Sequence, residues 1–488
     1  MSSLRVAFEA RGLYRKEFVD YLSSIVPRYP KILHFGDKHS HYDLTGLVRN
    51  RHLPGTLGYL LDGPHPDLSK MEYLEDQFYD KYFAVFADQL RRNSINFVRR
   101  GHKLDIRTDY YKFYRTVCDK FEEKLLAENV ESVVFFEIPH LAIDYSLYIV
   151  SKKLGLRTLI LSQKIPGKVF SMWNIEDFGN LNIKMQQIEA DRDPATDVKL
   201  FYMDPKWQKK SPRGKFGPVQ FCQLLKKLLL NQPRIIFSPG AFKSVVLRIS
   251  RVKRTLPEWR DILKYDLSDK QIKYFEKLCE FEKAVPDIKQ NYVYVPLHLQ
   301  PEMTTSSLGG KFVDQALMIE TLSQMLPEGW FLFIKENPKQ SAYDRDEVFF
   351  DRINKLGNAR WVPSDFDTQL LSSHAKVVAT VSGVAGWEAI KVGTPALIFG
   401  VTWYLSMPGV FKFTDETDIE KIASFKIDPD FLTRSQKFLF SKTHEGNIDK
   451  IYFKHVMNFD KNKNVVDIGN VINALLTGEI ETTFMSSN

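Results

Sequence analysis

The sequence predicts an α/β protein built from two doubly wound domains, each around a mostly parallel sheet. Three observations support this fold class. Apolar strands alternate with helix-like segments, as in the strand at 130–140, the helical pattern of 141–155 and the strand at 156–162. The length of 488 residues exceeds a single ordinary core. Unusual polar residues follow several strands, as expected where ligands bind beyond the carboxyl ends of an open sheet.

Each predicted strand is a short apolar run that ends in a turn or a polar loop. The runs lie at 30–36, 130–140 and 156–162 in the first half, and at 291–302, 329–338, 375–381 and 394–399 in the second. Between the last two strands, only Trp387–Val392 has clear helix-forming content.

Changes in composition divide the chain into four parts. We expect a Rossmann-like domain at 1–204, a basic and mainly helical insertion or linker at 205–285, a second Rossmann-like domain at 286–425, and a helical segment at 426–488. The insertion is basic because lysines and arginines cluster between Lys206 and Arg260 with few acidic neighbours. Such a run is usually a solvated face, but it also suits an anionic membrane surface or an anionic glycan.

Composition places the protein among soluble globular chains, with 44% hydrophobic and 26% charged residues. The formal net charge of +8 suits an anionic substrate or a membrane surface, and we expect no nucleic-acid partner. Cys118, Cys222 and Cys279 show no metal-site spacing. The N-terminus lacks the apolar core of a signal peptide, and no apolar stretch suits a membrane span. We therefore expect a cytoplasmic protein that binds peripherally at the inner face of the membrane.

The stretch Val381–Gly400 combines a strand end, a loop of small residues and a helix start. Free backbone N–H groups and the positive end of the helix dipole make such a place an anion site. Ser382 offers a hydroxyl, and Gly383 lets a ligand approach the backbone closely. Glu388 is predicted in the first helical turn, where the helix dipole alone favours an acid. Its alternative role is to hold ribose hydroxyls.

Two further strand ends of the second half carry polar residues. Lys335 ends the strand at 329–338, where it either neutralises a phosphate or simply reaches solvent. His298, Gln300 and Glu302 alternate at the end of the stretch 291–302, after its apolar run, and a hydroxyl-rich loop follows them. This stretch is either a flexible loop with a helix cap or a set of hydrogen-bond partners for a sugar or nucleotide.

A polar cluster also follows a strand of the first half. Glu137, His140 and Asp144 lie close together in the sequence, and a carboxylate among them could act as general base on an acceptor hydroxyl. A buried and satisfied polar cluster is the competing interpretation. The same choice applies to the histidines of another loop, which are His34, His39 and His41.

Metal binding is the weaker interpretation of the one short acidic motif. Asp365 and Asp367 form a D-x-D pair, which can hold a divalent cation on a diphosphate. An N-cap for the helix predicted to follow is the simpler explanation. No Cys/His spacing indicates zinc, so we expect no metal site.

Residues 292–400 resemble the bacterial capsular and surface polysaccharide glycosyltransferases of the GT-B type. This group includes the Kdo-transferases of capsule assembly and the bacterial sialyl- and polysialyltransferases. The resemblance is carried by Pro296–Thr305, Leu326–Pro338 and Val381–Gly400. A lysine–acid–histidine–proline motif of the group reads Lys335-Glu336-Asn337-Pro338 here. Asn337 can donate a hydrogen bond to the donor nucleotide, but it cannot carry a charge or a proton.

The resemblance implies a GT-B-like fold whose two domains face an interdomain cleft, with acceptor in the first and nucleotide sugar in the second. It places Ser382, Gly383 and Glu388 at the donor nucleotide, and it is looser at Glu137 and His140. It implies transfer of a sugar, with CMP-linked donors favoured, to a growing capsular or surface polysaccharide that is free or lipid-linked. Fixed N–H dipoles and Lys335 would stabilise the departing nucleotide without a metal or another cofactor.

Two alternatives remain open at this point. One is a nucleotide-sugar epimerase or hydrolase of the same architecture. The other is a non-catalytic, nucleotide-binding component of a polysaccharide assembly complex, which the replacement of the motif histidine by Asn337 keeps open.

Overall fold

The structure is a computed structural model of the chain. It describes residues 4–25, 29, 31–44, 77–98, 110–181, 273–274, 277–278, 280–281, 284–300, 302–337, 340, 345–364 and 366–485. The basic segment from Lys206 to Arg260 lies outside these residues, as do Asp365 and two of the three cysteines. The predictions made for the basic segment therefore stay predictions.

The first sheet has seven strands in the order β13-β6-β5-β4-β1-β2-β3. The strands from β5 to β3 in this order pair in parallel, whereas β6 pairs antiparallel with both β5 and β13. The bounds are β1 Arg5–Ala10, β2 Lys31–Gly36, β3 Tyr42–Asp43, β4 Ser132–Phe135, β5 Arg157–Ile165, β6 Lys168–Met172 and β13 His444–Glu445.

The second sheet has six strands in the order β12-β11-β10-β7-β8-β9, and every neighbouring pair is parallel. The bounds are β7 Tyr292–Pro296, β8 Phe331–Lys335, β9 Ala359–Val362, β10 Val377–Thr380, β11 Ala396–Ile398 and β12 Val410–Lys412. Strands β4 and β7 end earlier than the sequence suggests, so the polar residues after them stand in loops.

Both sheets have the doubly wound topology that the sequence predicts. In each, the chain runs outward from a central strand on one side and then returns to build the other side, which is the strand order of a dinucleotide-binding fold. The order reverses between β1 and β4 in the first sheet and between β7 and β10 in the second. We call these places the first and the second switch point. In open α/β sheets, ligands bind beyond the carboxyl ends of the strands there.

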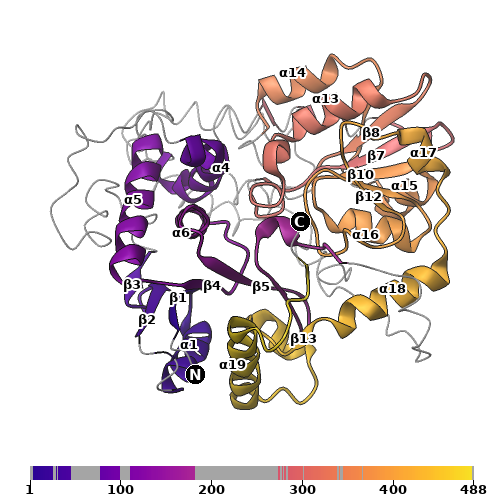
Figure 1. The fold of residues 1–488 in the computed structure, drawn as a ribbon. Helices are drawn as coiled ribbons and strands as arrows, with labels where there is room; N and C mark the ends of the chain where they lie inside the picture. The colour runs from indigo at the N-terminus through magenta and orange to yellow at the C-terminus, as the bar shows by residue number, and fades with distance from the viewer. Residues whose placement is uncertain are drawn as a thin grey trace, which may run out of the picture.

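Helices cover both faces of each sheet (Figure 1). In the first domain they are α1 Leu13–Ser24, α4 Gln77–Val98, α5 Tyr111–Ala127 and α6 Ile143–Lys153. In the second they are α13 Gln315–Met325, α14 Glu347–Asn354, α15 Thr368–His374, α16 Val384–Lys391 and α17 Ile419–Ser424. Two helices follow in the C-terminal segment, α18 Pro429–Ser441 and α19 Lys461–Thr477.

Strand alternation explains how one strand serves two cores. In β1, Val6 and Phe8 pack with α1 and α19, whereas Ala7 between them joins the core under α4, α5 and α6. Successive side chains of a strand point to opposite faces of the sheet. Because β1 is covered on both faces, it is buried from Val6 to Ala10 and is apolar there except at Glu9.

The C-terminal segment at 426–488 is part of the first domain, which differs from the separate helical segment that we predicted. Helix α18 runs from the second lobe to the first, and α19 lies beside α1 (Figure 1). Strand β13 pairs with β6 at the edge of the first sheet. The apolar residues of α19 include Ile468 and Ile472, which are buried in the core of α1. Their helical spacing predicts an amphipathic helix, but it does not say which distant surface the helix covers.

Aromatic side chains join the two domains. Trp387 of α16 is 1% exposed and lies 4.8 Å, between ring centroids, from Trp403. Trp403 in turn stacks on Phe170 of β6, in the first domain, at 6.1 Å. Gly179 has a φ of 90°, and a Cβ there would lie 1.8 Å from the carbonyl oxygen of Thr402. The backbones therefore approach each other at Gly179 more closely than any other residue allows.

Candidate active site

The first switch point is lined by the residues that follow β1 and β4. Glu9, near the end of β1, is 3% exposed, and its carboxylate lies 2.6 Å from Nε of Arg11. Burial raises the pKa of Glu9, although Arg11 opposes the change. Gly12 then begins α1 with a φ of 86°, and its N–H donates to the Asp37 carboxylate at 2.7 Å. The sequence did not predict Glu9 and Arg11 as site residues, although they form an ion pair at this switch point.

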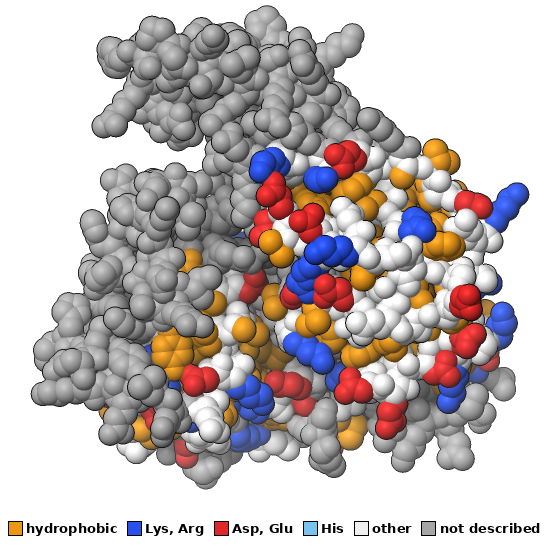
Figure 2. Space-filling model, turned by 90° about the horizontal axis from the view of Figure 1, so that it is seen from above, with side chains coloured by type: hydrophobic (Ala, Val, Ile, Leu, Met, Phe, Trp, Pro, Cys, Tyr) orange, Lys and Arg blue, Asp and Glu red, His pale blue; other side chains and the backbone are white. Residues whose placement is uncertain are grey.

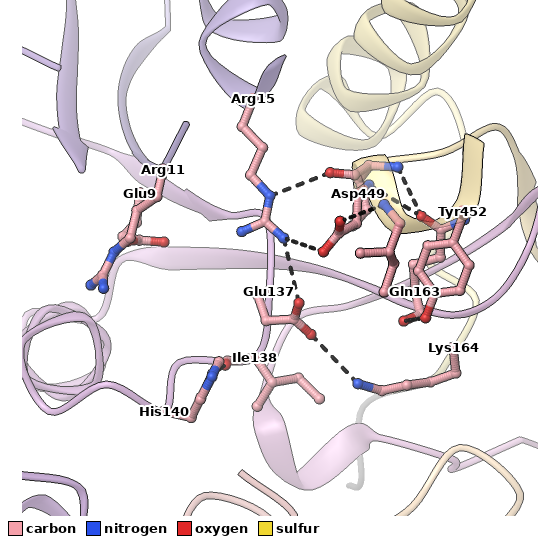
Figure 3. A network of polar contacts seen from close by, with 12 residues as sticks. Glu9, Arg11, Arg15, Glu137, Ile138, His140, Gln163, Lys164, Asp449 and Tyr452 are labelled. Atoms are coloured by element: carbon pink, nitrogen blue, oxygen red, sulfur yellow. Dashed lines mark hydrogen bonds and ion pairs between the residues drawn. The ribbon is translucent and has the colours of Figure 1, made fainter. Parts of the chain in front are cut away.

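Glu137 lies in the loop after β4, between two cations (Figure 3). One carboxylate oxygen is 3.4 Å from the Arg15 guanidinium, and the other is 3.5 Å from the Lys164 ammonium. Burial acts to raise the pKa of Glu137, but Lys164, Arg15 and His140 together lower it. Its side chain is 25% exposed. Glu137 is therefore an ionised carboxylate that solvent and a ligand can reach.

His140 and Asp144 have different surroundings from Glu137. Nδ1 of His140 lies 2.7 Å from the carbonyl oxygen of Ile138, so Nδ1 carries the proton and Nε2 is the nitrogen that can accept one. Asp144 is buried and accepts the N–H groups of Leu141 and Tyr145, each at 2.7 Å. Its carboxylate thus fixes the loop that leads into α6. Of the three predicted residues, Asp144 is the one that serves the fold.

The histidines of the loop near β2 do not form a common site. His34 belongs to β2 and is 2% exposed, and its Nε2 lies 2.8 Å from the carbonyl oxygen of Ala10. Burial lowers the pKa of His34. The His41 ring lies edge-on to it at 6.0 Å, and the backbone of His39 donates to Asp37. For His34, the satisfied structural interpretation is correct.

At the second switch point, His298 after β7 meets the end of β10. Its Nε2 lies 2.8 Å from the Thr380 hydroxyl and 3.5 Å from the Ser382 N–H. Burial, together with the nearby charge of Arg345, lowers the pKa of His298 to about 4. The ring is therefore neutral at neutral pH, so it can hydrogen-bond a ligand but cannot supply a positive charge to a phosphate.

Helix α16 begins at Val384, directly after Gly383, so the loop of small residues is shorter than predicted. Glu388 consequently lies in the second helical turn, and its placement in the first turn was wrong. Val384, Ala385 and Gly386 form the first turn of this helix, where we predicted a loop. A Cβ on Gly383 would lie 2.6 Å from the His298 ring. The protein's own histidine therefore already requires glycine there.

Beneath this switch point lies a buried polar network centred on Arg345. Its guanidinium pairs with Glu336 at 2.7 Å and donates to Oε1 of Gln300 at 2.7 Å and to the carbonyl oxygen of His298 at 3.1 Å. Gln300 also accepts a bond from Gln315. The Gln300 side chain is thus engaged inside the protein, where it shapes the loop after β7. Arg345 was not predicted as a site residue, because it does not lie at the end of a predicted strand.

Lys335, at the carboxyl end of β8, is 9% exposed. Its ammonium donates to the carbonyl oxygen of Phe366 at 2.5 Å and to the Thr368 hydroxyl at 2.8 Å. Asp367 accepts the N–H groups of the first turn of α15, so its predicted role as an N-cap is confirmed. Lys335 therefore stands beside the start of α15 as a buried cation and does not simply reach solvent. Asn337 follows it closely, and its N–H donates to Glu336.

The hydroxyl-rich stretch after His298 is a packed set of turns, not the flexible loop that we considered. Thr305 is 0% exposed and Ser306 is 2% exposed. Both hydroxyls donate to the carbonyl oxygen of Glu302, at 3.1 and 2.9 Å. They satisfy the backbone in the way that serine and threonine often do. Glu302 thus shapes the turn through its backbone.

This set of turns connects the two switch points. The Ser382 hydroxyl donates to the carbonyl oxygen of Thr304 at 2.5 Å. Three residues further on, the Ser307 hydroxyl donates to the carbonyl oxygen of Pro139, and Gln89 of α4 donates to Ser307 at 2.9 Å. Pro139 lies between Glu137 and His140. The fold thereby brings the predicted acceptor loop and the predicted nucleotide loop into contact through one turn.

Three further observations bear on the predicted site. Within the described ranges, no three His, Cys, Asp or Glu side chains are grouped as a metal ion requires. None of the helices that the structure describes is long and apolar enough to cross a membrane. A surface hollow of about 430 Å³ lies among Arg5, Leu125 and Val130, at the amino-terminal edge of the first sheet and so opposite to the switch points.

The solved structures that this chain matches include two of KpsC from Thermosulfurimonas dismutans. The beta Kdo 2,7 transferase is 9% identical, covers 72% of this chain and 90% of its own, and has a TM-score of 0.30. The beta Kdo 2,4 transferase is 12% identical, covers 63% and 79%, and has a TM-score of 0.28. The UDP-GlcNAc 2-epimerase of Methanocaldococcus jannaschii is 11% identical, covers 97% and 100%, and has a TM-score of 0.20. Similarities this weak carry no argument about activity.

Sequence comparison is more specific for the second domain. No curated protein matches the chain. Residues 260–443, less than half of the chain, match the family of capsule polysaccharide biosynthesis proteins. These residues contain all of the second sheet and both loops of the second switch point. The predicted resemblance to capsule polysaccharide biosynthesis proteins is thereby confirmed for the second domain and its switch point.

Proposed function

We propose that the protein is a glycosyltransferase of capsule polysaccharide synthesis, which moves a sugar from a nucleotide-sugar donor to a growing glycan. The observation that carries the proposal is the contact between the two switch points, through the turn from Thr304 to Ser307. Transfer needs a donor and an acceptor side by side. The capsule family match covers the second switch point, where we propose that the donor binds.

In the proposed reaction, an acceptor oxygen forms a bond to the anomeric carbon of the donor sugar. The bond between that carbon and the phosphate breaks, and its electron pair leaves with the nucleotide. Glu137 takes the proton of the acceptor hydroxyl, because it is the ionised and accessible carboxylate of the first switch point. Lys335 and the first N–H groups of α16 stabilise the negative charge that grows on the nucleotide.

The two alternative functions are compatible with the same architecture, but neither transfers a sugar to an acceptor. An epimerase or hydrolase acts on a nucleotide sugar without a glycan acceptor, and a binding component turns over nothing. Incubation of the full chain with CMP-, UDP- and GDP-sugars, with and without capsular oligosaccharides, separates the three. Acceptor-dependent transfer supports the proposal. Turnover without any acceptor favours an epimerase or hydrolase, and binding alone favours the assembly component.

Nucleotide affinity tests the donor site. We expect Lys335→Met to weaken nucleotide binding roughly 10- to 100-fold, because a charged hydrogen bond contributes about 1.5–3 kcal/mol. Glu388→Ala should also weaken binding if it holds the ribose. Calorimetry measures both, with the exposed Lys391 at the end of α16 as the matched control in Lys391→Ala. Since Lys335 is buried, urea unfolding of the variant checks its fold. Unchanged affinity in both folded variants means that the nucleotide binds elsewhere.

Metal independence is a second expectation, because the proposed charge stabilisation relies on Lys335 and on backbone N–H groups. The kcat/KM of the wild-type protein for transfer should be the same in the presence and in the absence of EDTA. If EDTA abolished the activity and magnesium or manganese restored it, the protein would need a metal ion, and Asp365 and Asp367 would be the first candidate ligands.

We also propose a cytoplasmic protein that associates peripherally with the inner face of the membrane. This rests on the basic segment between Lys206 and Arg260 and on the overall charge of +8. Across the described part of the face in Figure 2, acidic and basic side chains are interspersed.

A further inference from the structure

The turn that follows β13 lies against the first switch point, although it comes from the far end of the chain. Its centre, Asn447, is 1% exposed. The Tyr14 hydroxyl of α1 donates to the Asn447 carbonyl at 2.8 Å, and the Gln163 amide of β5 donates to its side-chain oxygen at 2.7 Å. Asn464 of α19 donates to the same carbonyl at 2.9 Å. Three elements therefore fix this turn from three sides.

The residues after Asn447 are held as firmly. The Gln163 side-chain oxygen accepts the N–H of Ile448 at 2.9 Å and that of Asp449 at 3.3 Å. The Tyr452 hydroxyl donates to the Gln163 carbonyl at 3.0 Å. Figure 3 shows Gln163, Asp449 and Tyr452 together with Lys164, the residue of β5 that follows Gln163. The Asp449 side chain is oriented by a further bond, because its Oδ1 accepts the Ile451 N–H at 3.0 Å as the N-cap of the short helix Lys450–His455.

Arg15 connects this turn to Glu137. Its Nε donates to the carbonyl oxygen of Ile448 at 3.3 Å. One terminal nitrogen lies 3.7 Å from the Asp449 carboxylate and 3.4 Å from that of Glu137 (Figure 3). Arg15 is 15% exposed at its side chain, so its charge is partly removed from water. The guanidinium therefore bridges a carboxylate of the C-terminal segment and the predicted general base.

We propose that Asp449 is a positioning residue of this enzyme, whose negative charge partly neutralises Arg15 beside Glu137, while the carbonyl oxygen of Ile448 keeps Arg15 in place. The proposal rests on the proposed function, in which Glu137 takes the acceptor proton. The charged groups that face Glu137 come from four elements: Arg15 of α1, Lys164 of β5, His140 of its own loop and, through Arg15, Asp449. The C-terminal segment is then part of the active site as well as of the fold.

This arrangement predicts opposite effects for its two partners. Arg15→Gln removes a positive charge next to Glu137, so the pKa of Glu137 rises and the acid limb of kcat/KM moves to higher pH. Asp449→Asn removes the negative charge that offsets Arg15, so the acid limb moves to lower pH. Each displacement should be about 0.2–0.7 pH units, the size expected for a partly exposed ion pair. A residue that only supports the fold would not displace the two profiles in opposite directions.

The test measures kcat/KM against pH for full-length wild type, Arg15→Gln and Asp449→Asn, with the donor and acceptor found in the nucleotide-sugar panel. Glu445→Gln is the matched control, because Glu445 lies on the same segment, is 89% exposed and pairs with Lys168 at 3.5 Å. We expect its profile to coincide with that of wild type. Displacement of both variants in one direction, or an Asp449→Asn profile equal to the control, overturns the proposal.

Urea unfolding of the same variants gives a readout that needs no activity. If Asp449 and Arg15 interact as an ion pair, the double variant Arg15→Gln/Asp449→Asn is less destabilised than the sum of the two single variants. Additive effects overturn the proposal even in an active enzyme. If wild type transfers no sugar from any donor while the coupling is present, the proposed function fails and the contact between Asp449 and Arg15 is supported.

Discussion

Arg345→Met should lower the free energy of unfolding by roughly 3–5 kcal/mol, because it leaves a buried carboxylate without its partner. The Arg345 and Glu336 side chains are 0% and 2% exposed, and their closest atoms lie 2.7 Å apart. The loss is large because the buried Glu336 carboxylate must then either stay charged without a cation or water beside it, or take up a proton. Urea unfolding at neutral pH measures the difference.

Arg352→Met is the matched control for this change. Arg352 also pairs with two carboxylates, Glu320 at 2.5 Å and Asp314 at 2.6 Å, but its side chain is 32% exposed. Water screens such a pair, so we expect a loss below about 1 kcal/mol. The double variant Arg345→Met/Glu336→Gln should recover part of the stability, since no buried charge is left unpaired. Equal losses for Arg345→Met and Arg352→Met would refute the buried ion pair.

The same substitution should impair nucleotide binding, because Arg345 donates to the carbonyl oxygen of His298 and to the side chain of Gln300. Both residues belong to the loop after β7 at the second switch point. Arg345 therefore acts on the ligand through the loop that it supports.

Glu137→Gln should lower kcat/KM for transfer roughly 100- to 10,000-fold, which is the usual contribution of a general base. Glutamine keeps the shape of the side chain but cannot take up the acceptor proton. Since Lys164 and Arg15 lower the pKa of Glu137, the wild-type enzyme should keep its activity at pH values down to below the ordinary range of a glutamate. The measurement is transfer rate against pH for the wild type, with the rate of the variant at neutral pH.

Asp144→Asn is the control that separates an effect on catalysis from an effect on the structure of this loop. Asp144 accepts backbone N–H groups of its own loop, so its replacement should reduce stability more than Glu137→Gln does. Nucleotide affinity should be unchanged in Glu137→Gln, because Glu137 lies at the other switch point. Wild-type kcat/KM in a folded Glu137→Gln variant would remove this residue from the mechanism and turn attention to Glu9, another carboxylate at the first switch point.

The sequence alone determined the fold class and the regions that matter. Apolar strands with helical segments between them lead to parallel sheets, and polar residues at the carboxyl ends of parallel strands gather at one edge. For this reason Glu137, His298, Lys335 and Ser382 were correctly placed at strand ends before any tertiary structure was known. These features are local, and periodicity and turn residues suffice to detect them.

Only the tertiary structure decided which of these side chains the protein itself uses. Gln300 accepts a hydrogen bond from Arg345, 45 residues further along the chain, which a pattern of neighbouring residues does not reveal. Asp144 and Ser306 bond to backbone groups within four residues, and the structure decided between that local role and a ligand contact. The start of α16 at Val384 moved Glu388 by one turn, because glycine and alanine packed as a helix where the sequence suggested a loop. The partners of Glu137 show the same limit. Arg15 and Lys164 come from distant parts of the first domain, which the order of its strands brings to Glu137, and the packing of β13 and α19 adds the turn at Asp449.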